Sequence, residues 1–328
     1  MVYANQEIEE GLISVIMSNY NTPRGYLKES IESILNQSYP NFEFIIVDDA
    51  STDDSWEYLN SFSDARIRLI RNGENRGLTY SLNRALEQCR GEYVARMDSD
   101  DISLPQRFER QIAFMRDHPD VIVSGTWFEF LDERNNQTKT RIAKESISDR
   151  ESYRIRLLFG NSPTILHPSA CFNRRLLLKF GIRYREKYRY AQDYRMWVDC
   201  ANSAECDIVP EMLVKYRVHE KAISVDKLDE QTQCAINVIQ EQLDALHLEM
   251  PEDVKRLHHG YFYKDRYSFR MELWLRRILR ANRRYRVYDQ KKLKEIVWTR
   301  WRGIRRNYLY WTCIGIQHKI KTILGLED

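Results

Sequence analysis

The stretch "GEYVARMDSDDISLPQRFERQ", residues 91–111, places an apolar run, three carboxylates and a helical pattern one directly after another. The run up to Arg96 is short and apolar, as expected of a strand covered on both faces. Asp98, Asp100 and Asp101 follow it, and Pro105 suits the first turn of the next helix. A strand with a polar end that leads into a helix is typical of an α/β sheet.

Earlier segments repeat this order of strand and helix. Short apolar runs rich in β-branched residues occupy 12–21, 42–52 and 66–72, before the run at 92–100. Helical patterns lie at 26–37, 53–62, 78–89 and 104–119. We therefore predict an α/β fold with a mostly parallel, doubly wound (Rossmann-like) sheet and helices on both faces.

Polar residues follow each predicted strand. They are Tyr20–Asn21, Asp48–Asp49, Asn72–Gly77 and Asp98–Asp101. In a doubly wound sheet, ligands bind outside the carboxyl ends of the strands, so these four groups are predicted to meet at one edge.

The three carboxylates that follow Met97 repel one another unless a cation lies among them. Mg²⁺ and Mn²⁺ prefer such oxygen ligands together with phosphate oxygens. A metal–diphosphate site is one interpretation of the cluster. A solvated loop or helix cap, where Asp is common, is the other.

After residue 120 the pattern changes. Strand-like runs lie at 121–132 and 207–220, helical ones at 147–162 and 189–205, and 165–181 begins as a strand and becomes a helix. Helical signals dominate from 226 onward. We predict one domain at 1–225, with halves at about 1–120 and 121–225, and a basic, aromatic-rich helical C-terminal region at 226–328.

The bulk composition excludes several classes of protein. The 51 basic and 48 acidic side chains give a net charge of +3, so the whole chain has no general attraction to polyanions. The six cysteines form no C-x-x-C pair, which favours reduced thiols over a zinc site or a disulfide framework. We expect neither a signal peptide nor a membrane span, since no apolar run reaches 18 residues.

Seven segments add a more specific signal over roughly residues 12–225. They are "SVIMSNYN", "ESIESILNQSYPNFEFIIVDDASTDDS", "NRGLTYSLNRAL", "GEYVARMDSDDISLPQRFERQ", "HPSACFNRR", "AQDYRMW" and "YRVHEKAIS". In this order the chain resembles the family 2 glycosyltransferases, which have the GT-A fold. The resemblance implies inverting, metal-dependent transfer of a hexose (galactose, glucose or N-acetylhexosamine) from a UDP-sugar to a hydroxyl of a glycan acceptor. It also implies that residues 1–225 are the catalytic domain, with a nucleotide-sugar half at 1–120 and an acceptor half at 121–225.

The resemblance also implies a biological setting. The acceptor is expected to be a polyprenyl-diphosphate-linked or other lipid-linked sugar, in the synthesis of a bacterial surface polysaccharide such as O-antigen, capsule or lipooligosaccharide. By the same analogy, we expect a cytoplasmic enzyme at the inner face of the cell membrane.

The resemblance assigns roles to the residues at the strand ends. Asp49 corresponds to the carboxylate that binds the base, where it can accept the imide N–H of uracil, and Asp48 shares that work. Asp98 is expected to contact the ribose and Asp100 to bind Mn²⁺ or Mg²⁺, with Asp101 as a third carboxylate. The remaining nucleotide-sugar contacts are expected from Asn21, Arg76 and Ser99.

Two later motifs supply the remaining candidates. In "AQDYRMW", Asp193 is the expected catalytic base and Gln192, where many relatives have Glu, a positioning residue. Asp193 could instead cap the helix that follows, and the two roles are compatible. In "YRVHEKAIS", His219 is expected to complete the metal site, although a plain surface histidine is the alternative. His167 is expected to lie in the pocket or on the acceptor side.

Basic and aromatic residues interleave from Arg270 to Lys321. The basic groups are "RRILRANRRYR", "KKLK", "RWRGIRR" and "HKIK", and four of the seven tryptophans lie among them. This combination favours an anionic membrane surface as the partner of the C-terminal region. A solvated helical face packed on the catalytic domain is the main alternative, and nucleic acid is not expected as a partner.

Other functional classes make predictions that the sequence does not meet. A nucleotide-dependent oxidoreductase predicts G-x-G-x-x-G after the first strand, where this chain has "SNYNTPRGY". A processive synthase of the same fold predicts transmembrane helices and a Q-x-x-R-W motif. A non-catalytic nucleotide-sugar-binding relative or scaffold would have lost the metal carboxylates or the base, and Asp98, Asp100 and Asp193 are all present.

Overall fold

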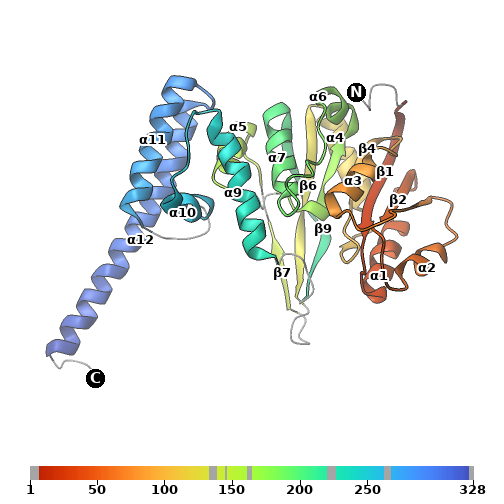
Figure 1. The fold of residues 1–328 in the computed structure, drawn as a ribbon, viewed down its shortest axis with the longest axis horizontal. Coiled ribbons are helices and arrows are strands. Elements are labelled where there is room, and N and C mark those ends of the chain that lie inside the picture. The colour runs from red at the N-terminus through yellow and green to blue at the C-terminus, as the bar shows by residue number, and fades with distance from the viewer. Residues whose placement is uncertain are drawn as a thin grey trace. The chain divides into compact units, whose positions relative to one another are not determined.

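The computed structural model describes residues 7–132, 139–144, 146–160, 165–219, 227–261 and 267–324, without the side chains of 132–143 and 308–324. The chain divides into two compact units, one of residues 1–150 with 162–234 and one of residues 151–161 with 235–328 (Figure 1). The division falls inside helix α9 (Leu228–Asp244), and most of helix α5 (Arg150–Leu158) belongs to the second unit. The domain boundary at residue 225 stays a prediction.

The first four strands form the parallel half of the sheet, as predicted. These are β1 (Glu9–Asn19), β2 (Phe42–Asp48), β3 (Ile67–Arg71) and β4 (Gly91–Arg96). They lie in the order β3-β2-β1-β4, and each neighbouring pair is parallel. The helices that connect or follow them are α1 (Arg24–Leu35), α2 (Ser55–Asn60), α3 (Leu78–Leu86) and α4 (Arg107–Asp117).

The second half of the sheet is mixed. Its strands are β5 (Ile102–Ser103), β6 (Val121–Asp132), β7 (Lys139–Ala143), β8 (Cys171–Asn173) and β9 (Glu205–Val218). From β4 the order continues β8-β6-β9-β5, and β7 pairs with β6. The pair β6–β9 is parallel, whereas β8 runs antiparallel to β4 and β6. The single-turn helix at His167–Ser169 precedes β8, and α6 (Arg174–Phe180) and α7 (Gln192–Ser203) lie between β8 and β9.

Alternation along the strands explains why helices cover both faces of the parallel half. Ile13, Val15 and Met17 on β1 share one face and a cluster with apolar side chains of α1, α2 and α4. The helix α3 packs against β1 and β2 and buries Leu82 and Leu86. Strands covered on both faces are mostly apolar, which is why β1, β2 and β4 contain nearly continuous apolar runs.

The second unit is helical and has its own core. After α9 come a short turn (Glu252–Val254), α10 (Lys255–His259), α11 (Phe269–Tyr285) and α12 (Gln290–Leu324). At its centre the Trp274 indole donates to Nδ1 of His258 at 2.8 Å, and Nε2 of His258 lies 2.8 Å from the carbonyl of Leu158. Burial lowers the pKa of His258 to about 4, so the ring is neutral and Nε2 carries the hydrogen. Among the described residues, no helix combines the length and apolarity needed to cross a bilayer.

We predict that Gly91→Ala destabilises the parallel half of the sheet. A Cβ at Gly91 would lie 2.6 Å from the carbonyl oxygen of Leu12 and 2.7 Å from the amide nitrogen of Ser14, both main-chain atoms of β1. Forcing the strands apart costs about 1–3 kcal/mol of the free energy of unfolding, measured by urea denaturation. The matched control is Gly73→Ala, since a Cβ there has no atom within 4 Å. Equal stability of the two variants would contradict this packing.

Candidate active site

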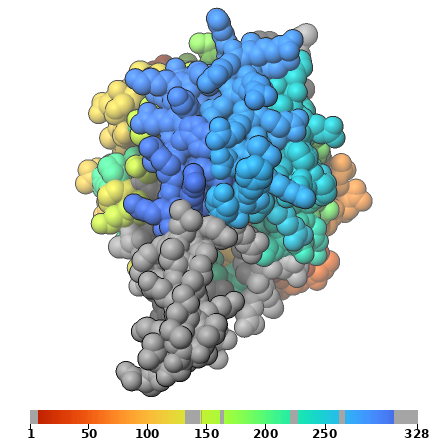
Figure 2. Space-filling model, turned by 90° about the vertical axis from the view of Figure 1, so that its left-hand side faces the viewer, coloured from red at the N-terminus to blue at the C-terminus, as the bar shows by residue number. Residues whose placement is uncertain are grey.

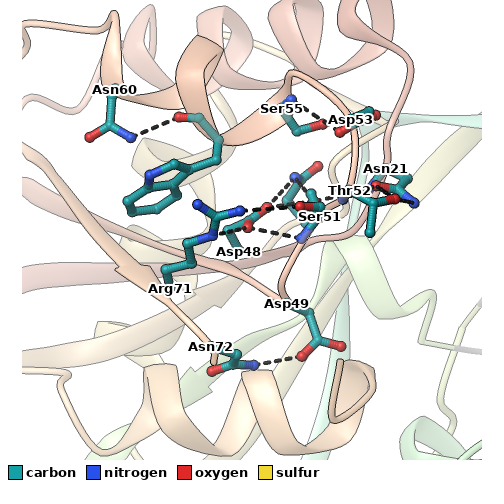
Figure 3. A network of polar contacts seen from close by, with 12 residues as sticks. Asn21, Asp48, Asp49, Ser51, Thr52, Asp53, Ser55, Asn60, Arg71 and Asn72 are labelled. Carbon is teal, nitrogen blue, oxygen red and sulfur yellow. Dashed lines mark hydrogen bonds and ion pairs between the residues drawn. The ribbon is translucent and has the colours of Figure 1, made fainter. Parts of the chain in front are cut away.

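Asp48, the last residue of β2, organises the loop that follows it. The loop residue Ser51 donates to this carboxylate through its amide at 3.1 Å and its hydroxyl at 2.5 Å, and Asn19 donates at 2.9 Å (Figure 3). Arg71 on β3 lies 3.5 Å away. Asp48 is fully buried, so its carboxylate is turned into the loop.

The next carboxylate, Asp49, points the other way, toward Asn72 (Figure 3). It accepts hydrogen bonds from Asn72 Nδ2 at 2.6 Å and from the amides of Arg76 and Gly77 at 2.9 and 2.7 Å. Gly77 has φ +87°, a conformation that suits glycine, and it caps α3. Asp49 therefore fixes the turn that leads into α3 as well as lining the cleft described below.

The acids after β4 meet as the sequence predicts. Oxygen atoms of Asp98, Asp100 and Asp101 all lie within 4.8 Å of one another. Burial raises the pKa of Asp98 and raises that of Asp101 well above its usual range, and the neighbouring carboxylates add to both shifts. Asp101 accepts from the amide of Arg217 at 2.8 Å, while its other oxygen, Oδ2, is buried without a partner.

This cluster fits a divalent cation. Its donors are hard carboxylate oxygens, which Mg²⁺ and Mn²⁺ prefer, and an added cation would offset the repulsion that raises the pKa values. The orphaned Oδ2 of Asp101 is a further sign, because a buried acceptor without a partner is costly.

Arg96 supplies the fixed positive charge beside the acids. Its guanidinium is 1% exposed and forms an ion pair with Asp98 through Nη2. Its charge lowers the pKa values of Asp98, Asp101 and Asp193 against the larger effect of burial. One buried cation thus acts on both the acid cluster and the candidate base.

His219 and Arg217 place the end of β9 against the acid cluster. Nε2 of His219 lies 3.1 Å from Oδ2 of Asp100, and its ring packs on Tyr26 with centroids 5.2 Å apart. Arg217 donates to the carbonyl of Asp100 at 2.9 Å and pairs with Glu29 on α1. These contacts fix the His219 side chain next to Asp100, a candidate metal ligand.

The helix α7 begins with the candidate base. Asp193 Oδ1 accepts from the amide of Tyr194 at 2.7 Å, and burial raises the pKa of its carboxyl. Gln192 is 9% exposed, and its Oε1 is buried without a partner. The hydroxyl of Tyr184 lies 2.7 Å from Nε2 of His167, and burial holds the pKa of His167 well below its ordinary value, so this imidazole is neutral.

A cleft of about 600 Å³ opens above these groups within the first unit. Predicted site residues that line it are Asn21, Asp49, Asp98, Ser99, Asp100, Gln192 and His219. The other predicted residues lie behind or beside this surface. Asp48 is within its loop, Asp101 and His167 are buried, and Asp193 follows Gln192 on α7. The Arg76 side chain stacks on Tyr80 at 4.5 Å.

Comparisons with known proteins show the family of this chain. The sequence profile described as glycosyl transferase family 2 matches residues 14–181. An uncharacterized glycosyltransferase of Methanocaldococcus jannaschii is 36% identical over 230 residues, which are 69% of this chain and 77% of that protein. This chain belongs to glycosyltransferase family 2. It is a glycosyltransferase.

Two further comparisons bear on the family and the fold. The UDP-Glc:alpha-D-GlcNAc-diphosphoundecaprenol beta-1,3-glucosyltransferase WfaP of Escherichia coli is 40% identical over 104 residues, 32% of this chain and 41% of WfaP. The crystal structure of Staphylococcus aureus TarS residues 1–349 with UDP-GlcNAc has a TM-score of 0.59 at 18% identity, and covers 82% of this chain and 81% of that one. That likeness supports the GT-A fold.

Several cleft residues of this glycosyltransferase were not predicted from the sequence. Thr22 lines the cleft and its hydroxyl lies 2.7 Å from that of Ser99. Arg189 and Lys227 add two positive charges to the lining, and Tyr190 and Gln231 complete that side. Only the polar character of "YNT" after β1 could have signalled Thr22. Arg189 lies three residues before Gln192, so the motif around Gln192 could have suggested it as a site residue.

We predict that Asp48→Ala destabilises the enzyme by about 2–4 kcal/mol, because it leaves buried donors of Asn19 and Ser51 without their acceptor. Thermal or urea unfolding measures the loss. Asp54→Ala is the control, since Asp54 is 65% exposed in its ion pair with Arg24 and should change stability by less than about 0.5 kcal/mol. Equal stability of the two variants would contradict an organising role for Asp48.

Proposed function

We propose that this enzyme is an inverting, metal-dependent hexosyltransferase that uses a UDP-sugar and a glycan hydroxyl. The observation that supports it most is the single cleft in which Asp49, the acid pair Asp98 and Asp100, and the start of α7 converge. These are a base-binding carboxylate, a cation site and a neighbouring acid, which together match the requirements of this reaction.

Asp49 is suited to recognise the base. Its two oxygens offer about four acceptor sites, and three donors in the protein occupy only part of that capacity. Oδ2, bonded only to the amide of Gly77, can accept the imide N–H of uracil. Asn72 and the amides of Arg76 and Gly77 hold Asp49 in place, Asp48 orders the adjoining loop, and Asn21 and Ser99 line the nucleotide side of the cleft. WfaP, a relative, is named for UDP-Glc as donor.

Asp98, Asp100, Asp101 and His219 are the residues that would hold Mn²⁺ or Mg²⁺, with Asp100 and His219 already in contact. When bound, such a cation supplies positive charge to the departing nucleoside diphosphate. Arg189 and Lys227 line the same cleft and add fixed charge for the phosphates. Gln192, with an unpartnered Oε1, can accept a hydrogen bond from a sugar hydroxyl.

Asp193 is the proposed general base. It would take the proton of the acceptor hydroxyl as that oxygen attacks the anomeric carbon from the face opposite the leaving diphosphate, which inverts the configuration. Burial raises the pKa of Asp193, which makes it a stronger base than an exposed aspartate. Arg96 opposes that shift and favours the ionised form that the step needs.

The acceptor is proposed to be a lipid-linked glycan in polysaccharide synthesis. The names of two relatives support this: WfaP acts on a diphosphoundecaprenol-linked sugar, and another is a putative teichuronic acid biosynthesis glycosyltransferase of Bacillus subtilis, 42% identical over 106 residues. A membrane-bound acceptor requires the enzyme at the membrane surface. We therefore propose peripheral association with the inner face of the cell membrane through the basic C-terminal region.

We predict that Asp193→Ala and Asp100→Ala both abolish transfer but differ in nucleotide binding. Loss of a general base costs about 10²–10⁴-fold in kcat and leaves UDP affinity unchanged. Loss of Asp100 is expected to weaken UDP binding when Mn²⁺ is present, because Asp100 would help to hold a cation whose positive charge favours the diphosphate. Product analysis across a panel of nucleotide sugars, with isothermal titration of UDP with and without chelator, separates the two variants.

Asp117→Ala, on the exposed end of α4, is the control for this comparison. The reverse pattern of UDP affinities would overturn the assignment.

We also predict that kcat falls with decreasing pH through a pKa above that of an ordinary aspartate. The raised pKa of Asp193 means that its carboxyl binds a proton at a higher pH than an exposed one, and the protonated form cannot act as base. A kcat profile at saturating donor and metal measures this. An acid limb at the ordinary aspartate value would contradict burial of the base.

A further inference from the structure

The charge of this chain is concentrated on one pair of helices in the second unit. Residues 269–307, which form α11 and the first half of α12, hold 14 of the 51 basic side chains and three of the 48 acidic ones. The rest of the chain has 37 basic and 45 acidic groups, a net charge of −8. A net charge of +11 on 39 residues is far outside what the overall composition suggests. Figure 2 views the face on which the described parts of α11 and α12 (blue) lie side by side.

A hollow of about 650 Å³ lies between these two helices. Its cations are Arg276 from α11 and Lys291, Lys294, Arg302 and Arg305 from α12. Trp298 and Trp301 form its apolar part. We call these seven residues the basic groove. Glu272 and Glu295 line the same hollow, so its five cations exceed its two carboxylates. A smaller hollow of about 290 Å³ shares Arg276, Lys294 and Trp298 with it and adds Arg280 and Arg283.

The basic groove is ordered by its own contacts. The Arg276 guanidinium lies 5.2 Å from the Trp298 ring, so it reaches from α11 onto α12. Glu272 accepts hydrogen bonds from Arg276 at 2.7 Å and from the Trp301 indole at 3.3 Å. These bonds lower the pKa of Glu272, and its negative charge is paired within the hollow. Lys291, Lys294, Arg302 and Arg305 are exposed at the rim. The groove thus presents an excess of cations around an indole floor.

We propose that the basic groove binds the phosphate headgroup of an anionic membrane lipid. Guanidinium groups bind phosphate oxygens through paired hydrogen bonds, and tryptophan is the residue favoured at headgroup depth. The volume matches a headgroup-sized ligand. This deepens the membrane association proposed above by naming its binding site, and it does not depend on the donor, the metal or the base.

The course of α12 favours a membrane over a nucleic acid. The helix continues from the groove to Leu324, and no acidic residue occurs between Glu295 and Glu327. The sequence of this continuation is rich in aromatic and aliphatic residues, among them Tyr308, Tyr310, Trp311, Ile314 and Ile316. A nucleic acid offers no apolar layer to such a segment, whereas a lipid surface offers both phosphate and acyl chains.

Sedimentation of the full-length protein with vesicles tests the proposal. Vesicles of phosphatidylcholine with phosphatidylglycerol should bind the protein, and phosphatidylcholine alone should not. The triple variant R276Q/K294Q/R302Q should lose binding by about fivefold for each groove cation removed. The matched control is R277Q/R284Q/R306Q, which removes the same charge from exposed positions of the same helices that do not line either hollow. It should lose clearly less.

Each other outcome overturns the proposal. Equal losses in the two triple variants would mean that diffuse charge, not the groove, binds the membrane, and unchanged binding would remove this surface from the interaction. Tighter binding of a labelled single-stranded RNA than of vesicles at the same salt would assign the groove to nucleic acid. Competition by free glycerol phosphate at micromolar concentration would assign it to a soluble anion.

Two controls separate the groove from folding and from catalysis. If the triple variant fails to fold, Lys294→Glu against Arg306→Glu gives the same comparison with single exposed side chains. Nucleotide-sugar hydrolysis in solution should be unchanged in every groove variant. A groove variant that binds vesicles poorly but hydrolyses normally supports the proposal even if the donor assignment fails.

Discussion

The site depends on the ion pair between Arg96 and Asp98 at the end of β4. Three carboxylates lie within a few ångströms there, in a buried environment where like charges repel strongly. Arg96 can remain charged although it is buried, because Asp98 and Asp101 raise its pKa against the effect of desolvation. The ion pair therefore stabilises the cluster. Without it, the carboxyl groups would bind protons more strongly or move apart.

The surroundings hold Arg96 and β4 in position. Arg107 on α4 donates to the carbonyls of Arg96 and Ala170, which ties the end of β4 to the strand β8. Two of the guanidinium nitrogens of Arg96, Nε and Nη1, have no hydrogen-bond partner. Because these atoms are buried, Arg96 acts on a ligand beside Asp98 through the field of its charge and not by direct contact.

The sequence predicted the strand ends correctly because their signals are local. A buried parallel strand is mostly apolar, so a group of consecutive polar residues marks its carboxyl end, and the sheet topology brings these ends together. Arg189 and Lys227 do not follow a strand of the parallel half, so this signal did not apply to them. They come from a loop before α7 and the start of α9, and their place in the cleft depends on the packing of distant segments.

Side-chain direction was the other property that the sequence did not determine. Asp48 and Asp49 are adjacent acids, yet the first is turned into its loop and the second lines the cleft. Successive residues near a strand end point to opposite sides, so one position decides between a structural and a binding carboxylate. The direction of His167 was likewise not readable from the sequence: it lies in the short helix before β8, with its Nε2 2.7 Å from the Tyr184 hydroxyl.

The uneven distribution of charge is consistent with two separate tasks. The acid cluster of the cleft fits a divalent cation although Arg96, Arg189 and Lys227 lie beside it or in the lining. An anionic surface needs positive charge that is in excess and exposed. A chain that concentrates +11 on one helical pair and leaves −8 elsewhere can present such a surface, which a uniform mixture with the same net charge of +3 could not do.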